Sequence, residues 1–224
     1  MEQKTINSLT HCPLFHQMSE MEIEAALGGI YCKKMVYKKN DLHTIEGFPC
    51  NHVDIVLSGK MTARMVAPSG KQMEVIRLSR GDLIAPNFIF SEQHIMPVTI
   101  ETESQVSILR MSPDSLRQMV DSHAIIRWNF IHLLSNIGDY LASKMKFLSL
   151  LTIKEKVIFY LRSLMQAQRS RTIQLDKSRQ HLADAFAIQK FSLIRCLAEL
   201  EAEGAIQING KEITILDIKK LQLR

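Results

Sequence analysis

The chain has 224 residues, of which 46% are hydrophobic and 23% charged, and its net charge at pH 7 is +5. This composition is typical of folded globular proteins, and the length is enough for two ordinary domains, so a disordered or fibrous protein is excluded. The first residues lack the apolar region of a signal peptide, and no run of 18 apolar residues occurs, which predicts a cytoplasmic protein with no membrane partner.

Between Tyr31 and Met111 the sequence alternates short apolar segments with turn residues. Each segment has the period-two alternation or the β-branched content that is typical of a strand. The intervening turns contain glycine, proline, asparagine or aspartate, and Pro68, Ser69 and Gly70 form one of them. Six or more short strands at this spacing predict a β-barrel or jelly roll rather than a parallel sheet. The predicted strands are residues 33–37, 53–57, 60–66, 73–78, 97–101 and 105–111.

Two helices are predicted to follow this region. Ser112 and Pro113 are typical of a helix start, since serine is a good N-cap and proline is tolerated in the first turn. After a break near Ser122, a long helix is predicted to end near Leu150. Its apolar residues are spaced by threes and fours, which predicts that they form the seam of a two-fold homodimer. The alternative is that the same residues pack onto the chain's own barrel. The predicted interface consists of Ile126, Phe130, Leu134, Ile137, Leu141, Met145 and Leu148.

The C-terminal region has the order helix, turn, helix, hairpin. Ser178 can cap the first helix, and residues 187–189 leave room only for a tight turn before the second. Gly204 is expected to end the second helix, and Asn209 and Gly210 are expected to turn the hairpin. This order is typical of a winged helix-turn-helix, whose second helix enters the major groove of DNA. The apolar faces of the two helices consist of Leu182, Ala183 and Phe186, and of Leu193, Cys196, Leu197 and Leu200.

The distribution of charge also indicates duplex DNA as the partner. Residues 152–224 carry 13 Lys/Arg and 8 Asp/Glu, whereas residues 1–151 carry 15 of each. The whole excess of positive charge therefore lies with the helix-turn-helix, as expected of a phosphate-binding module. The alternative is that the two helices and the hairpin form an ordinary packing unit. The exposed face of the second helix is predicted to present side chains that suit base edges or phosphates, namely Gln189, Lys190, Ser192 and Arg195.

Five segments carry a resemblance to a known family: Leu14-Phe15, Tyr37-Lys38-Lys39-Asn40-Asp41, residues 55–61, Gly81-Asp82 and Arg179-Gln180-His181-Leu182-Ala183. Together they resemble the Crp/Fnr family of bacterial transcription regulators, from Leu14 onward. The resemblance implies an α+β architecture with an N-terminal β-roll sensor domain (1–122), a long dimerisation helix (123–150) and a C-terminal winged helix-turn-helix (151–224). It also implies a homodimer that binds inverted-repeat double-stranded DNA, with RNA polymerase as a further partner if the protein is an activator.

The same resemblance implies roles for single residues in the DNA-binding region. Arg179 would contact phosphate, and the start of the second helix would face DNA. Two positions depart from the family pattern: Ala187 stands where glycine is common, and Phe191 stands where a charged residue is common. Phe191 suits the methyl group of thymine. The predicted DNA-binding residues are Arg179, Gln180, Gln189, Lys190, Phe191, Ser192, Arg195 and Lys211.

Family members that bind cyclic AMP hold its phosphate with an Arg-Ser pair that follows the Gly-Asp/Glu turn. Here no arginine lies between Arg80 and Arg110, and Leu141 and Ala142 stand where a Thr-Ser pair meets the adenine. Cyclic AMP is therefore not expected and no cofactor is predicted, although haem or another small effector stays open. A signal would act through a hinge at residues 151–154. The predicted effector pocket is lined by Gly81, Asp82, Phe88, Phe90, Met96 and Leu141. The alternative is that the roll is filled by its own side chains and holds no ligand.

Two alternative functions stay open at this stage. A β-roll can carry a metal-dependent enzyme of the cupin type, which needs a His-x-His pair and converging Glu and His side chains. His43, His52 and His94 are isolated in the sequence, and the four cysteines have no Cys-x-x-Cys spacing, so neither a catalytic residue nor a metal site is predicted. The other alternative is a Crp-like regulator that does bind a cyclic nucleotide.

Overall fold

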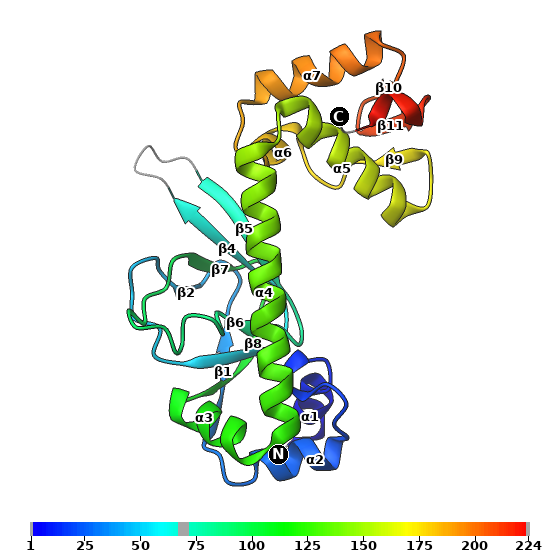
Figure 1. Ribbon diagram of the computed structural model, residues 1–224. Helices are drawn as coiled ribbons and strands as arrows, with labels where there is room; N and C mark the ends of the chain where they lie inside the picture. The colour runs from blue at the N-terminus through cyan, green and yellow to red at the C-terminus, as the bar shows by residue number, and fades with distance from the viewer. Residues whose placement is uncertain (1, 67–71, 223–224) are drawn as a thin grey trace. The chain divides into compact units, whose positions relative to one another are not determined.

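The computed structural model describes residues 2–66 and 72–222 (Figure 1). The chain forms two compact units, residues 1–140 and 141–224, and the boundary between them falls inside the longest helix, α4 (Ala124–Leu150). None of the helices in these described ranges is both long enough and apolar enough to span a membrane. The turn predicted at Pro68, Ser69 and Gly70 lies outside the described residues.

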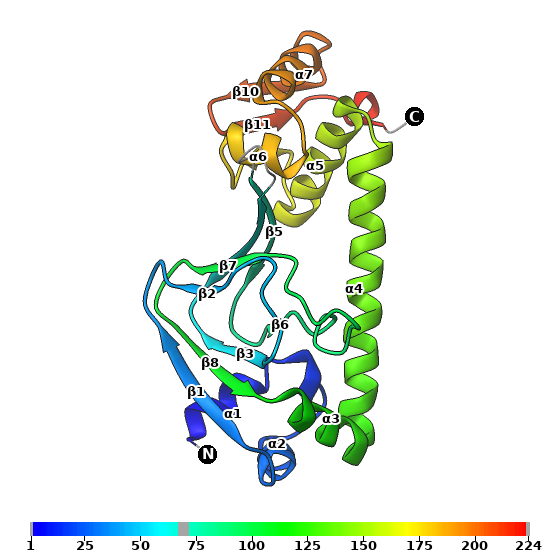
Figure 2. The same cartoon turned by 90° about the vertical axis from the view of Figure 1, so that its left-hand side faces the viewer.

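The N-terminal unit is built on two four-stranded antiparallel sheets that form a β-roll (Figure 2). In one sheet the strand order is β1 (Cys32–Tyr37), β8 (Val106–Met111), β3 (Val53–Ser58) and β6 (Leu83–Ile84). In the other it is β2 (Leu42–Thr44), β7 (Thr99–Thr102), β4 (Met61–Val66) and β5 (Gln72–Leu78). All six predicted strands are confirmed. The sequence pattern does not predict β2 and β6, because two or three residues are too few for a periodic signal.

Short helices cover the roll, and their caps explain where they begin. Ser19 and Glu22 form a capping box, in which each side chain bonds the other residue's backbone N–H. Ser112 caps the helix that has Pro113 in its first turn, which confirms the predicted helix start. These helices are α1 (Gln3–Leu9), the 3-10 helix η1 (Pro13–Phe15), α2 (Glu20–Leu27) and α3 (Pro113–Ser122).

The long helix α4 begins directly after His123, whose extended backbone makes the predicted break. Ile126 and Phe130 are buried in the hydrophobic core of the N-terminal unit. These two predicted dimer contacts are therefore corrected, because they pack within the monomer core and leave almost no surface for a second copy. Three of the other predicted contacts are half-buried, namely Leu134, Ile137 and Leu148. The remaining two, Leu141 and Met145, are exposed.

The C-terminal unit contains a helix, α5 (Ile153–Gln168), that the sequence pattern does not predict. Thr152 and Glu155 form a capping box at its start. Ile153 and Lys154 were assigned to the hinge but lie in the first turn of α5, so the non-helical connection is shorter than predicted. The other elements are β9 (Thr172–Gln174), α6 (Arg179–Ala185), α7 (Lys190–Ala202), β10 (Ile206–Asn209), β11 (Glu212–Ile215) and the 3-10 helix η2 (Ile218–Leu221).

The C-terminal strands form a three-stranded antiparallel sheet in the order β10, β11, β9. The predicted hairpin is confirmed, but its turn lies one residue later than predicted. Asn209 pairs with Glu212 and so extends the strand, and the turn consists of Gly210 and Lys211. Gly210 has a φ of +59°, which fits the first central position of a type II′ turn, where glycine is preferred.

Candidate functional site

The helix-turn-helix is made by α6, a tight turn and α7 (Figure 1). The Ser178 hydroxyl caps α6 by accepting a hydrogen bond of 3.2 Å from the backbone N–H three residues on. The helix ends in a Schellman motif, in which Ile188 N–H donates to the Ala183 carbonyl at 3.0 Å and Ala187 N–H donates to the Asp184 carbonyl at 3.1 Å. Ala187 has a φ of +56°, and this left-handed residue produces the sharp turn.

The two sides of α7 differ as the predicted spacing requires. One side packs into the core of the C-terminal unit through Leu193, Cys196, Leu197 and Leu200. Burial raises the pKa of the Cys196 thiol to about 11, so this cysteine stays a neutral packing residue. The other side holds the predicted DNA-facing residues, of which Ser192 is half-buried and the rest are exposed: Gln189, Lys190, Phe191 and Arg195.

Two apolar side chains also lie exposed on α7. Phe191 is 73% exposed and Ile194 is 45% exposed. One turn further along, Arg195 Nε lies 3.4 Å from Glu199 Oε1 in an ion pair that is largely exposed. Such a pair contributes little free energy, so Arg195 can exchange this carboxylate for another partner at low cost. The start of α7 therefore presents both charge and an unusually large apolar side chain to its surroundings.

Arg179 connects the helix-turn-helix to the wing. Its Nη2 donates a hydrogen bond of 3.0 Å to the carbonyl of Gly210 in the hairpin turn. Arg179 is half-buried, and burial lowers the pKa of its guanidinium. Lys211 follows Gly210 in the hairpin turn and is exposed. Gln180 is also exposed and bonds Asp184 at 2.9 Å. The predicted phosphate-contacting residue thus also fixes the position of the wing.

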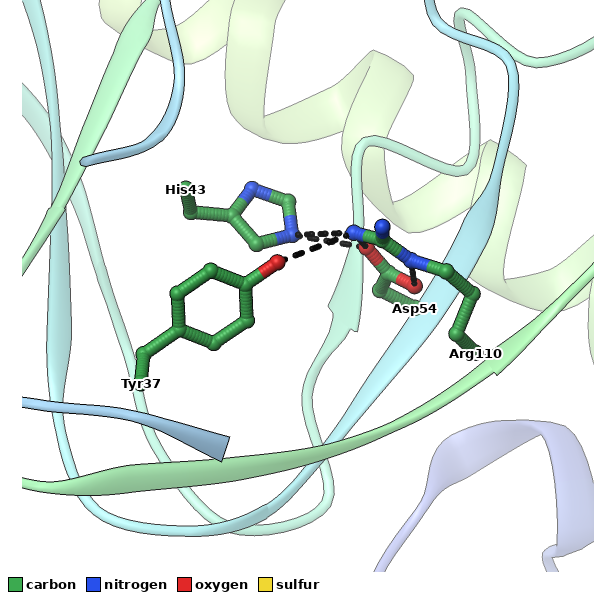
Figure 3. A network of polar contacts seen from close by, with 4 residues as sticks. All are labelled: Tyr37, His43, Asp54 and Arg110. Atoms are coloured by element: carbon green, nitrogen blue, oxygen red, sulfur yellow. Dashed lines mark hydrogen bonds and ion pairs between the residues drawn. The ribbon is translucent and has the colours of Figure 1, made fainter. Parts of the chain in front are cut away.

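A second polar site lies inside the β-roll (Figure 3). Asp54 on β3 and Arg110 on β8 occupy directly opposite positions of the antiparallel pair. The guanidinium binds the carboxylate in a bidentate way, with Nε to Oδ1 at 2.8 Å and Nη2 to Oδ2 at 2.7 Å. His43 from β2 places Nε2 2.6 Å from Asp54 Oδ2, and the Tyr37 hydroxyl lies 3.3 Å from Arg110 Nη2. We call these four residues the polar centre; they come from both sheets of the roll.

The electrostatics of the polar centre favour the ionised pair. Burial alone would raise the pKa of the Asp54 carboxyl, whose side chain is 2% exposed. Hydrogen bonds from Arg110 and His43, together with their charges, outweigh burial, and the net effect lowers this pKa. The hydrogen bond to Asp54 is also the main cause that raises the pKa of Arg110. The two charges therefore stabilise each other within the roll.

The polar centre was not predicted from the sequence, where His43 was described as isolated. One local signal does exist: the first five residues of β3 are buried, and Asp54 is the charged residue among four apolar ones. A charge in such a strand needs a partner, because an unpaired buried charge is very costly. The partner could not be identified, since Arg110 is 56 residues away in the sequence and the pairing depends on the register of the sheet.

Gly81 and Asp82, which were predicted to line an effector pocket, stabilise a turn. Gly81 has a φ of +92°, and a Cβ atom at this position would lie 2.5 Å from the carbonyl oxygen of His11. The Asp82 carboxylate accepts a hydrogen bond of 2.7 Å from the backbone N–H of Ser79. The close approach of His11 explains the glycine at position 81, and the hydrogen bond in the turn explains the aspartate at position 82. Neither residue type requires a ligand.

The other four predicted pocket residues have different surroundings. Phe90 is 47% exposed, and its ring packs edge-on against Phe130 with the centroids 6.0 Å apart. Phe88 is half-buried, and Leu141 is 49% exposed and belongs to the C-terminal unit. Met96 is buried, and of the six predicted residues it alone lines a small cavity beside the polar centre. Within the described ranges, no three His, Cys, Asp or Glu side chains are grouped as metal ligands would be.

Two family models match this chain. The cyclic nucleotide-binding domain matches residues 34–123, and the Crp-like helix-turn-helix domain matches residues 155–224. The two matches fall in the β-roll and in the winged helix-turn-helix, respectively. No curated protein sequence matches the chain.

Several solved structures have the same fold. FixK2 from Bradyrhizobium japonicum is 16% identical, with a TM-score of 0.60 over 86% of this chain and 96% of that one. The c-di-GMP responsive global regulator CLP from Xanthomonas campestris is 19% identical, with a TM-score of 0.67 over 89% and 100%. A CooA mutant from Carboxydothermus hydrogenoformans is 15% identical, with a TM-score of 0.67 over 92% and 90%. At these identities the likeness shows the fold alone.

Proposed function

This chain belongs to the Crp/Fnr family of transcription regulators, and from that premise we propose that it binds a specific inverted-repeat DNA sequence as a homodimer. The observation that carries the proposal is the exposed start of α7, where Lys190, Phe191 and Arg195 project from a helix whose other side is buried. Lys and Arg side chains suit guanine edges or phosphates, and a phenylalanine ring suits the thymine methyl.

The wing supplies contacts of a different kind. The hydrogen bond from Arg179 to the Gly210 carbonyl uses one of the five N–H donors of the guanidinium, and the others can bind a phosphate oxygen. Lys211 lies in the same exposed turn, and Gln180 follows Arg179 on α6. These residues position the protein on the DNA backbone, whereas the start of α7 reads bases.

The dimer interface is formed by an exposed stripe of α4. Ile131, Leu141 and Met145 are exposed by 44%, 49% and 67%, and Leu134 and Gly138 lie between them at intervals of three and four. This alternation of three and four is the spacing of a coiled-coil seam. This exposed stripe lies on α4 next to a second apolar stripe, which contains the buried Ile126 and Phe130. In a two-fold dimer of helix-turn-helix proteins the two recognition helices bind half-sites about 34 Å apart, so we expect an inverted-repeat operator.

An effector that acts on this regulator is not a cyclic nucleotide. In the segment 94–97, where the family holds the cyclic phosphate, His94 bonds the Ile89 carbonyl through Nδ1 at 3.0 Å, and Met96 is buried. Met96 carries no charge, and the exposed His94 does not replace a buried arginine as the partner of a phosphate. We expect cyclic AMP at millimolar concentration to leave the DNA affinity unchanged. A cyclic AMP-dependent increase in affinity would contradict this part of the proposal.

The test is a selection of bound duplexes from a random pool, at a stated salt concentration and without added effector. The unmodified protein should recover an inverted repeat. Phe191→Ala should keep the repeat but lose preference at A·T positions next to the contacted guanines, because the thymine methyl contact is lost. The matched control is Lys33→Ala, which removes an exposed residue of the N-terminal unit and should leave the selected sequence unchanged. Salt-sensitive binding with no enriched sequence would overturn sequence-specific recognition.

A further inference from the structure

A groove lies between α1 and the outer face of the sheet that contains β1, β8 and β3. Lys34 on β1, Ser107 on β8 and Ser58 on β3 line it from three neighbouring strands. Side chains alternate between the two faces of a strand, and Ser107 is three residues from Arg110, so the groove is on the opposite face of the sheet from the polar centre. Its volume is about 530 Å³, which is in the range of small-molecule sites.

The side chains that line the groove are almost all hydrogen-bond donors. Of the described lining residues, nine carry a side-chain O–H or N–H group, and the tenth, Leu57, is apolar. No carboxylate is among these ten, although residues 1–151 contain as many Asp and Glu as Lys and Arg. The groove therefore concentrates positive charge in a region that is neutral as a whole. Its cations are Lys4, Lys34 and Arg80.

These three cations can accept a further partner. Lys34 Nζ lies 3.1 Å from Glu2 Oε2, but both side chains are largely exposed, so this pair contributes little free energy. Arg80 uses Nη2 for both of its hydrogen bonds, of 2.8 Å to the Asn7 carbonyl and 2.6 Å to the Asn7 side-chain oxygen. The donors on its Nε and Nη1 are left for a ligand. Lys4 is exposed, and no carboxylate in the described ranges pairs with it.

Two carboxylates near the groove limit its excess of positive charge. One is Glu2, the partner of Lys34, and the other is Glu20, which accepts hydrogen bonds of 2.6 Å from Gln3 and 3.5 Å from Asn7. The three cations exceed these two carboxylates by one charge. A ligand that replaces Glu2 as the partner of Lys34 would meet a second positive charge, so the groove suits an anion with more than one negative charge.

A β-bulge adds directional donors on the sheet side of the groove. The register between β3 and β8 shifts between Val56 and Ser58, which pairs Ser58 with Ser107. The two hydroxyl oxygens are 2.8 Å apart. One hydroxyl donates to the other, and the second hydroxyl then has its own hydrogen left to donate to a ligand. Hydroxyl, ammonium and guanidinium groups together are the donors that phosphate oxygens accept from.

We infer that this groove binds a small anion with two or more phosphate groups, such as a diphosphate-bearing metabolite. Its donors come from α1, from three strands and from the turn before β6, and a chain of phosphates can reach more of them than a single phosphate can. Lys4, Lys34 and Arg80 bind the phosphate oxygens, and the serine pair orients them. The inference concerns the N-terminal unit alone and holds whether or not the protein binds DNA.

The test is lysine footprinting of the full-length protein with an acetylating reagent, in the presence of inorganic pyrophosphate and without DNA. Pyrophosphate should protect Lys4 and Lys34 from acetylation in a saturable way. Lys33 is the internal control, because it is exposed and its side chain points to the other face of β1. Sulfate at the same ionic strength should protect the two groove lysines about tenfold more weakly, because it makes fewer charged hydrogen bonds.

Two variants assign the protection to the groove. Lys4→Gln and Arg80→Gln each remove one cation, and each should weaken the protection of Lys34 about tenfold, because a charged hydrogen bond is lost. Arg117→Gln, an exposed change on α3, should leave this protection unchanged. Equal protection of Lys33 and Lys34, equal protection by sulfate and pyrophosphate, an unchanged response in either groove variant, or no saturable protection would overturn the inference.

Discussion

Lys156 and Phe186 meet at a buried junction, where Lys156 Nζ donates a hydrogen bond of 3.2 Å to the carbonyl of Phe186. A second hydrogen bond, of 2.9 Å, goes from the same ammonium to the carbonyl of Leu148. Phe186 ends α6, and Leu148 lies in the last turn of α4. One cation thus satisfies carbonyls at the C-terminal ends of two helices, where positive charge is favourable. It connects the end of the long helix to the first helix of the DNA-binding motif.

Lys156→Met should therefore destabilise the C-terminal unit. The residue is 6% exposed, and its loss leaves two carbonyls without their charged donor, at a cost of about 1–3 kcal/mol in the free energy of unfolding. The matched control is Lys154→Met, two residues earlier on the same helix, which removes an exposed ion pair of 2.6 Å with Glu203 and should cost less than about 1 kcal/mol. Urea unfolding measures both values, and equal costs would contradict the role assigned to the junction.

The same junction predicts a pH dependence. Burial lowers the pKa of the Lys156 ammonium below its ordinary value of 10.5. Between the lowered pKa and 10.5 the unfolded state binds the proton more tightly than the folded state, so folding is favoured as the pH rises through this window. The stability of the wild type relative to Lys156→Met should therefore increase with pH up to about 10.5. A difference that falls as the pH rises would show that Lys156 gains more from its carbonyl partners than it loses by burial.

Asp54→Asn should be among the most damaging single changes in the roll. It leaves Arg110 without its buried partner, and breaking a buried pair in this way costs about 3 kcal/mol. Because the pKa of Asp54 is lowered from 3.8, its stabilisation is present above that value and is lost as the pH falls through the folded-state pKa. The difference between wild type and variant should therefore shrink in acid. Glu101→Gln, which breaks the half-exposed pair with Arg64, should cost less than about 1 kcal/mol in the same measurement.

The helix-turn-helix could be predicted because its signals are local. The cap at Ser178, the apolar spacing of α7 and the left-handed Gly204 are each read within a few residues, and each agrees with the structure. The hairpin was also predicted, but its turn was placed one residue early. The reason is that Asn-Gly favours a type I′ turn, whereas Asn209 pairs with Glu212 and leaves Gly210 to begin the turn.

Features that depend on contacts distant in the sequence could not be predicted. The pairing of Asp54 with Arg110 follows from the register between β3 and β8, which no local pattern contains. On α4 the apolar spacing is compatible with two neighbouring stripes, and burial alone assigns Ile126 and Phe130 to the monomer core. The effector pocket was proposed from an apolar segment, and the structure uses part of that segment to pack Phe90 on Phe130.

Ala187→Gly should stabilise the protein. Ala187 has a φ of +56°, and a left-handed residue with a Cβ costs about 1–2 kcal/mol, part of which glycine returns through its larger loss of backbone entropy. The expected gain in the free energy of unfolding is about 0.5–1 kcal/mol. Ala198→Gly, an exposed change within α7, should have the opposite sign and cost about 1 kcal/mol. A loss of stability in both variants would contradict the strain assigned to the turn.

Met145→Asp should convert the proposed dimer to a monomer. Met145 is 67% exposed and lies on the stripe of α4 assigned to the interface, where a buried carboxylate without a partner would oppose association. Asn136→Asp introduces the same charge at an exposed position on the opposite side of the helix and should leave the dimer intact. Sedimentation equilibrium measures the association state. A Met145→Asp protein that stays dimeric would move the interface to another surface.

Arg195→Ala and Arg179→Ala should affect DNA binding in different ways. Arg195 is exposed on the start of α7, and if it reads a base its loss should cost about 1–3 kcal/mol on the selected repeat and much less on random DNA. Arg179 bonds the Gly210 carbonyl and is proposed to contact phosphate, so its loss should weaken binding to all sequences alike and reduce the salt slope by about one. Fluorescence anisotropy over a series of salt concentrations measures both quantities for each variant. Equal losses on specific and random DNA in both variants would contradict the separation between base reading by α7 and backbone positioning by the wing.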